Sequence, residues 1–258
     1  MMSKKNIIDA INECEMCIFP FDVKNPDERL TPAGFNFSFT NFIISLNNKC
    51  PCALCEETII DKEYKSQIYF MLEAGDTALA LTRETIWVSG NIAGTFHSKV
   101  SYASQGLGQI STTLDPGWQG QLLISINNPN KSPVKVLVGN RKEDDGVIQY
   151  KTFITLCLYR LISPAETPSD NTYARLTIIE DILRDNVNRG DVQKTLDEIS
   201  AIKSIVDKER QTKDVHLGLK TSNPQTLTRF NDIHNTILDK LDKIVLIGNS
   251  VKTEARTR

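Results

Sequence analysis

Five of the six cysteines lie at spacings that could hold a metal ion. Cys14 and Cys17 form a C-x-x-C pair, and Cys50, Cys52 and Cys55 form C-x-C-x-x-C. Four thiolates from two such pairs suit the tetrahedral coordination of zinc. However, the gap between the pairs is longer than in compact zinc ribbons, and Cys17 opens an apolar run. We therefore expect reduced, uncoordinated thiols in a cytoplasmic protein, and no metal site.

The pattern of apolar residues, which indicates the elements that position the reactive residues, changes from strand-like to helical near residue 165. Before it, short runs rich in Val, Ile, Phe and Thr are separated by Gly, Pro and Asn. This pattern is typical of an antiparallel sandwich or barrel. We expect one helix at about 5–13, followed by strands at 35–46, 68–72, 77–81, 86–88, 122–126, 134–138 and 153–161.

After a linker at 163–170 the apolar period becomes helical. Stripes at three- and four-residue spacing predict helices near 176–187, 192–206 and 227–244. Asp191 after Gly190 indicates an N-cap that follows a glycine C-terminus. The helices either cover the β domain as a hairpin or bundle, or form a module that oligomerises or binds a protein partner. We divide the chain into a β domain at 1–162 and a helical module at 163–258, α+β overall.

Composition excludes several classes of function. The chain has 258 residues and a formal net charge of −2, so bulk electrostatics do not favour nucleic acid or an anionic membrane. No run of about 18 apolar residues is present, and the N-terminus lacks the apolar core of a signal peptide. A cytoplasmic location is the expectation.

Several segments, in order, carry a resemblance to a known family. The first is residues 6–22, similar to the family's first helix and following strand. Residues 30–37 stand where the family has Leu-x-Pro-Ala-Ser-hydrophobic-Asp-Leu, and residues 72–84 resemble its Pro-Gly strand entry and Leu-Ala-x-Thr-x-Glu. The strongest match is Leu-Asp-Pro-Gly-Trp-Gln-Gly at 114–120, where the family has Ile-Asp-Pro-Gly-Trp-x-Gly. Over about residues 5–162, the chain resembles the dCTP deaminase/dUTPase superfamily.

The resemblance implies a distorted antiparallel β-barrel of the dUTPase type, which forms homotrimers with nucleotide sites between subunits. It implies a pyrimidine deoxynucleotide of the dCTP or dUTP type, with Mg²⁺ on the phosphates. The catalytic carboxylate of a dUTPase-type reaction aligns with Asp115, although capping the Pro-Gly turn is an adequate structural reason for this residue. The resemblance places substrate-binding residues at Lys99, Ser101, Gly117, Trp118, Gly120 and Ser125.

The chain departs from the family at the residues that carry chemistry. The family motif Gly-Arg-Ser-Ser-hydrophobic-Ala-Arg-x-Gly-Leu reads Ser-Lys-Val-Ser-Tyr-Ala-Ser-Gln-Gly-Leu at 98–107. Lys99 keeps a charge without the guanidinium fork, Val100 can neither donate nor accept, and Ser104 removes a cation. The general acid/base Glu of the deaminases aligns with Ser125, whose hydroxyl cannot take that role unaided.

We therefore expect a protein that binds a nucleotide without deaminating it and carries a helical regulatory module. The alternative is an active hydrolase of deoxynucleotide metabolism, either a divergent dCTP deaminase or a dUTP diphosphatase. A structural scaffold is the third possibility. If a general base lies elsewhere, Glu73, Glu84 and Asp115 are the nearest carboxylates in sequence. His97, beside the altered motif, could carry a proton or be a surface residue.

Overall fold

The computed structural model describes residues 1–21, 29–108, 112–165, 172–184 and 190–211, together with 232, 235, 236, 239 and 240. The first helix begins after a capping box: Ser3 Oγ accepts from Asn6 N–H, and Asn6 Oδ1 accepts from Ser3 N–H. In chain order the elements are α1 (Lys4–Asn12), β1 (Met16–Phe19), β2 (Leu30–Thr31), β3 (Gly34–Ser45), β4 (Cys50–Pro51), β5 (Cys55–Thr58), β6 (Tyr64–Leu72), β7 (Thr77–Val88), β8 (Ile92–Ser98), α2 (Val100–Ala103), β9 (Thr113–Leu114), β10 (Gln119–Asn127), β11 (Val134–Lys142), β12 (Ile148–Tyr150), β13 (Thr152–Arg160), α3 (Thr172–Arg184) and α4 (Gly190–Gln211).

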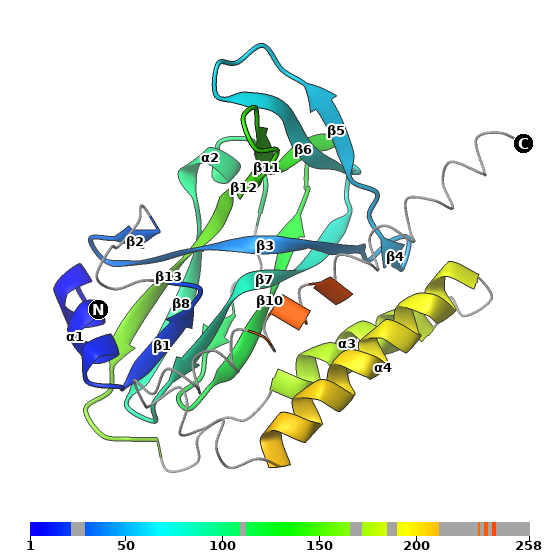
Figure 1. Ribbon diagram of the computed structural model, residues 1–258. Coiled ribbons are helices and arrows are strands. Elements are labelled where there is room, and N and C mark those ends of the chain that lie inside the picture. Colours follow the sequence, from blue (N-terminus) through cyan, green and yellow to red (C-terminus); the bar gives the residue numbers. More distant parts are fainter. Residues whose placement is uncertain are drawn as a thin grey trace, which may run out of the picture.

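The strands form two antiparallel sheets (Figure 1). The larger sheet has nine strands in the order β1-β7-β3-β13-β8-β9, with β10 paired to β7 and with β2 and β4 paired to β3. The smaller sheet has the order β12-β11-β6-β5. Curling of the larger sheet gives a distorted half-barrel, and helices follow it in the chain. The predicted fold class is confirmed as far as the structure shows it: mainly antiparallel β with C-terminal helices, α+β overall.

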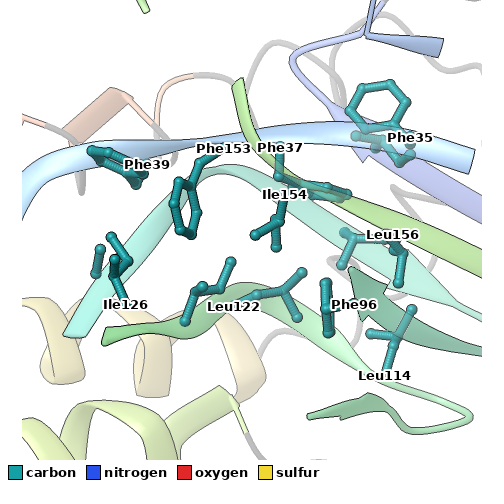
Figure 2. Packing of buried hydrophobic residues seen from close by; sticks show 14 of the residues in the cluster. Phe35, Phe37, Phe39, Phe96, Leu114, Leu122, Ile126, Phe153, Ile154 and Leu156 are labelled. Carbon is teal, nitrogen blue, oxygen red and sulfur yellow. The ribbon is translucent and has the colours of Figure 1, made fainter. Parts of the chain in front are cut away.

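The core lies between the two sheets and is rich in phenylalanine. Alternate residues of β3, namely Phe35, Phe37 and Phe39, point into it, as a strand period of two requires. Phe39 contacts Phe153 of β13 edge to face, with ring centroids 5.3 Å apart (Figure 2). Tyr102 of α2 contacts the same ring at 4.7 Å. The aromatic core therefore holds α2 against β13, which fixes the segment that carries the altered family motif.

β7 corrects one prediction. The two expected strands at 77–81 and 86–88 are a single strand with a bulge, because Leu81 pairs with Leu123 while Thr85 pairs with Gln121. The two extra residues of β7 are held by Thr82, whose hydroxyl accepts from Leu122 N–H and donates to the Glu84 carbonyl. Bulges re-aim side chains next to functional sites. Here the bulge contains Arg83 and Glu84.

α3 and α4 form a hairpin that covers the outer face of the larger sheet beside β7 and β10 (Figure 1). Glu180 of α3 and Lys203 of α4, both nearly buried, form an ion pair between the helices. α4 begins at Gly190, so Asp191 lies inside the helix and the predicted N-cap at Asp191 is wrong. The apolar cluster beneath the hairpin consists of Phe42, Ile44, Leu81, Ile179, Leu183, Leu196, Ile199 and Ile202.

Other predictions are partly covered by the described residues. Most of the predicted third helix at 227–244 lies outside them; Lys240, which is described, pairs with Glu198 at 3.0 Å. The pattern of apolar runs did not predict β2, β4, β5, β8, β9 and β12, which apart from the seven-residue β8 are at most four residues long. β1 overlaps the strand that the family resemblance implies after the first helix. The division of the chain into a β domain at 1–162 and a helical module at 163–258 stays a prediction. No helix among the described residues has the length and apolarity needed to span a bilayer.

Candidate functional site

A cavity of about 900 Å³ is lined by residues from both sheets and from α2. Its lining is strongly basic among the described residues, with Glu84 as the carboxylate. A concave site rich in cations attracts anionic ligands. The basic side chains are Arg29, Arg83, Lys99, Lys135 and Lys151.

Glu84 sits where β3 and β7 separate. The two strands pair from Phe39–Thr82 to Ser45–Ala78, whereas beyond Thr82 the partners of β7 are β1 and β10. The Glu84 carboxylate fills this fork and is 2% exposed. It accepts from Ser38 N–H at 2.9 Å and from Ser38 Oγ at 2.7 Å. A side chain thus satisfies a strand amide that would otherwise lack a sheet partner.

Arg29 completes the environment of Glu84. Its Nη1 lies 3.3 Å from Glu84 Oε1, and its guanidinium lies over the ring of Phe35 at 5.7 Å. Burial raises the pKa of Glu84 above its ordinary value, while the Ser38 hydrogen bonds and the Arg29 charge act in the opposite direction. The net effect is a raised pKa, so this carboxyl binds its proton more tightly than an exposed one.

The remaining cations have different neighbours. Lys135 pairs with Glu57 of β5 and lies over the ring of Tyr69. Lys99 donates to the hydroxyl of Thr152. Lys151 forms no side-chain ion pair with another described residue. Because only part of the positive charge is neutralised within the described residues, the cavity suits a multiply charged anion.

α2 brings two of the predicted substrate-binding residues to the cavity. Lys99 is the extended residue before the helix, and Ser101 lies in its first turn; both line the cavity. Val100 and Ser104, which replace family residues, are exposed and do not line it. Lys99 and Ser101 are therefore the part of the altered motif that faces the basic cavity.

The Asp-Pro-Gly-Trp turn lies apart from this cavity. Asp115 Oδ1 accepts from Thr113 Oγ1 at 3.1 Å, and the Asp115 carbonyl accepts from Trp118 N–H at 3.2 Å. Gly117 has a φ of +77°, which such a turn favours in glycine. The Trp118 ring is buried in the core, and its indole N–H donates to the Gly120 carbonyl at 3.3 Å. Within one chain these residues hold a turn and do not line the cavity.

Ser125 lies on the face of β10 that looks toward the helices. Leu122, Ile124 and Ile126 point into the core, so Leu123 and Ser125 point the other way. Leu123 contacts the apolar cluster under α3 and α4. The position that carries the general base in family deaminases thus lies on the helix-covered side and outside the cavity lining.

Of the three alternative carboxylates, the cavity contains Glu84. Glu73 is exposed at the start of a turn, and Asp115 belongs to the turn described above. His97 is exposed and lies 3.0 Å from the Thr95 hydroxyl, outside the cavity lining. The roles of Arg29, Arg83, Lys135 and Lys151 were missed in the sequence. One signal was present: Arg83 and Glu84 are adjacent charges inside a strand whose other residues are uncharged.

The cysteines are free thiols in the structure. In the described ranges, no three His, Cys, Asp or Glu side chains are grouped as the ligands of a metal ion. Burial, followed by the proximity of Cys14, raises the pKa of the Cys17 thiol to about 11. The described residues thus give the zinc alternative no ligand set.

Comparison with solved structures gives weak likenesses. The dCTP deaminase of Agrobacterium tumefaciens is 11% identical with a TM-score of 0.41, over 61% of this chain and 47% of that one. The native dUTPase of EIAV is 23% identical with a TM-score of 0.30, over 46% of this chain and 95% of that one. These scores are too low to transfer details of a site.

Comparison of sequences is more informative. The dUMP-forming dCTP deaminase of Methanopyrus kandleri is 28% identical over 186 residues, 67% of this chain and 86% of that protein. The dCTP deaminase of Pyrococcus furiosus is 26% identical over 159 residues, 62% of this chain and 85% of that protein. A family model described as dCTP deaminase-like matches residues 1–142, more than half of the chain. The chain therefore belongs to the dCTP deaminase-like family.

Proposed function

We propose that this protein binds a pyrimidine deoxynucleoside triphosphate, of the dCTP or dUTP type, without deaminating it through the family's general-base position. The observation that carries the proposal is the basic cavity, in which five cationic side chains meet the α2 segment. A triphosphate brings three to four negative charges, and charge-assisted hydrogen bonds from Lys and Arg are its usual protein partners. Family membership supplies the nucleotide class.

The loss of deamination rests on position 125. Water attack on cytosine requires a group that moves protons between water, the ring nitrogen and the leaving ammonia. Ser125 has no such capacity, and it lies on the strand face that α3 and α4 cover. Val100 and Ser104 stand where the family motif has a serine and an arginine, so a hydroxyl and a guanidinium are also lost. The cations of the cavity thus still bind the nucleotide, whereas the group that would move protons during deamination is missing.

Magnesium is an expectation of the family for a bound triphosphate. Mg²⁺ prefers one or two carboxylates together with phosphate oxygens. The described cavity lining offers one carboxylate, Glu84, which already accepts three hydrogen bonds. These residues do not fit a magnesium ion held by the protein. We therefore propose that the basic side chains neutralise most of the phosphate charge.

A homotrimer with nucleotide sites between subunits is part of the same proposal. Its support is the family resemblance, and its test is the molar mass of the purified protein in solution by light scattering. A mass of about 87 kDa would support three copies of the 29.0 kDa chain. A monomeric mass at micromolar concentration would contradict the trimer and leave the cavity as a site within one chain.

The binding proposal is tested by calorimetric titration with dCTP, dUTP, dTTP and ATP, with magnesium and with EDTA. We expect dCTP or dUTP to bind more tightly than ATP, with retention of binding in EDTA. Ammonia and pyrophosphate are followed in parallel, and neither is expected above the rate without protein. Absence of binding by all four nucleotides would refute the proposal.

A second candidate function follows from Glu84. It is a buried cavity carboxyl with a raised pKa, which is a property of general acids and bases. If the protein does release ammonia from dCTP, Glu84 is the group to carry the proton. In that case Glu84→Gln should abolish release while Ser125→Ala should leave it unchanged. Equal activity of Glu84→Gln and wild type would remove this candidate.

A further inference from the structure

Arg83 occupies a position that the family pattern Leu-Ala-x-Thr-x-Glu leaves variable. It lies in the β7 bulge, between Thr82 and Glu84. Thr82 fixes the bulge: its carbonyl accepts from Gln121 Nε2 at 2.8 Å, and its hydroxyl accepts from Leu122 N–H and donates to the Glu84 carbonyl across Arg83. The backbone of Arg83 is therefore set before any ligand arrives.

The guanidinium of Arg83 is fixed by stacking. It lies over the ring of Tyr150, with Cζ 3.7 Å from the centroid, and Tyr150 comes from β12 of the smaller sheet. The Tyr150 hydroxyl accepts from Asn41 Nδ2 at 3.4 Å. A planar cation on an aromatic face keeps its nitrogen atoms free to donate in the plane. The side chain is thus held at the cavity wall in one orientation.

One nitrogen of this guanidinium is buried without a partner. Arg83 Nη1 is inaccessible to solvent and has no acceptor among the described residues. The neighbouring carboxylate cannot serve, because Glu84 is engaged by Ser38 and Arg29. A buried charged donor that lacks an acceptor is costly, so the Arg83 guanidinium is incompletely satisfied within the chain and its charge favours an anion in the cavity.

We propose that the guanidinium of Arg83, which lines the cavity, binds a phosphate group of the ligand. The inference rests on the proposed function, and it names the residue that recognises the charge of the nucleotide. A phosphate is favoured over a neutral carbonyl because Lys99 and Lys151 line the same cavity. Cationic neighbours repel one another unless an anion lies between them.

The test compares Arg83→Met and Arg83→Lys with wild type for dCTP, inorganic triphosphate and deoxycytidine. Arg83→Met keeps the aliphatic length and loses the fork, and we expect the affinity for dCTP and for triphosphate to fall by roughly tenfold to a hundredfold. Arg83→Lys keeps the charge and should show an intermediate loss. Arg160→Met is the control, because Arg160 pairs with Glu15 outside the cavity lining.

Thermal unfolding without ligand separates a binding role from a structural one. Because Arg83 Nη1 is unsatisfied in the unliganded chain, Arg83→Met should unfold at the same or a higher temperature. A lower temperature with unchanged affinity would overturn the inference in favour of a structural role. Loss of affinity for dCTP with unchanged affinity for triphosphate would overturn the phosphate assignment. If wild type binds neither compound, the proposed function fails first.

Discussion

Ser38 donates both its backbone N–H and its hydroxyl to the carboxylate of Glu84, at 2.9 and 2.7 Å. The two residues are 46 positions apart, and their contact closes the fork between β3 and β7. The buried Glu84 carboxyl therefore holds β3 against β7 and also lines the cavity. Its protonation should consequently affect the stability of the fold.

The stability of wild type should decrease relative to Glu84→Gln as the pH rises. Burial raises the folded-state pKa of Glu84 above 4.5, so the folded state binds the proton more tightly than the unfolded state. This contribution is complete below about pH 4.5 and is lost as the pH rises through the folded pKa. The measurement is urea unfolding of both proteins from pH 4 to 9. A difference in free energy of unfolding that is independent of pH would contradict it.

Cys17 should resist alkylation in the folded protein. With a pKa raised to about 11, roughly one Cys17 thiol in a thousand is ionised at pH 8. Cys14 is exposed three residues away and provides the internal comparison. Mass spectrometry after iodoacetamide treatment should show Cys14 modified first, and in urea the two should react at similar rates. Equal rates in the folded protein would show that the Cys17 thiol is not protected.

Removing one apolar contact under the hairpin should weaken the fold measurably. Ile199 of α4 is fully buried in the cluster that joins α3 and α4 to the sheet. Ile199→Ala should cost about 2–5 kcal/mol in the free energy of unfolding, because it leaves a cavity. Its neighbour Ser200 is exposed, so Ser200→Ala is the matched control. Urea unfolding measures both; equal effects would show that α4 does not pack on the sheet as described.

The contributions of Glu180 and Lys203 to the free energy of unfolding should be coupled. Lys203→Met leaves Glu180 nearly buried with Arg184 3.8 Å away, so a loss of about 3 kcal/mol is expected. The double variant Glu180→Leu with Lys203→Met removes both charges and should be more stable than Lys203→Met alone. A double-mutant cycle of unfolding energies measures the coupling. Additive losses would mean that the pair contributes no mutual stabilisation.

The sequence predicted the long elements of the fold and little of the cavity. The 12-residue strand β3 (Gly34–Ser45) could be predicted because apolar side chains alternate with polar ones at Phe35–Phe39. The bulge at Arg83 was not visible, because it depends on a hydrogen bond from Leu122 to Thr82, 40 positions apart. Lys99 and Ser101 were found by family resemblance, whereas Lys151 follows no motif. Long-range pairing of strands brings these cations together, and no local pattern encodes it.

The smaller sheet also limits how copies of this chain can meet. Its terminal strands are β12, of three residues, and β5, whose side chains include Glu56 and Glu57. Short edge strands and charged side chains on an edge strand oppose the addition of a strand from another molecule. Growth into fibrils through these borders is therefore disfavoured. Association of copies through these two borders should therefore rely on side-chain contacts rather than on strand pairing.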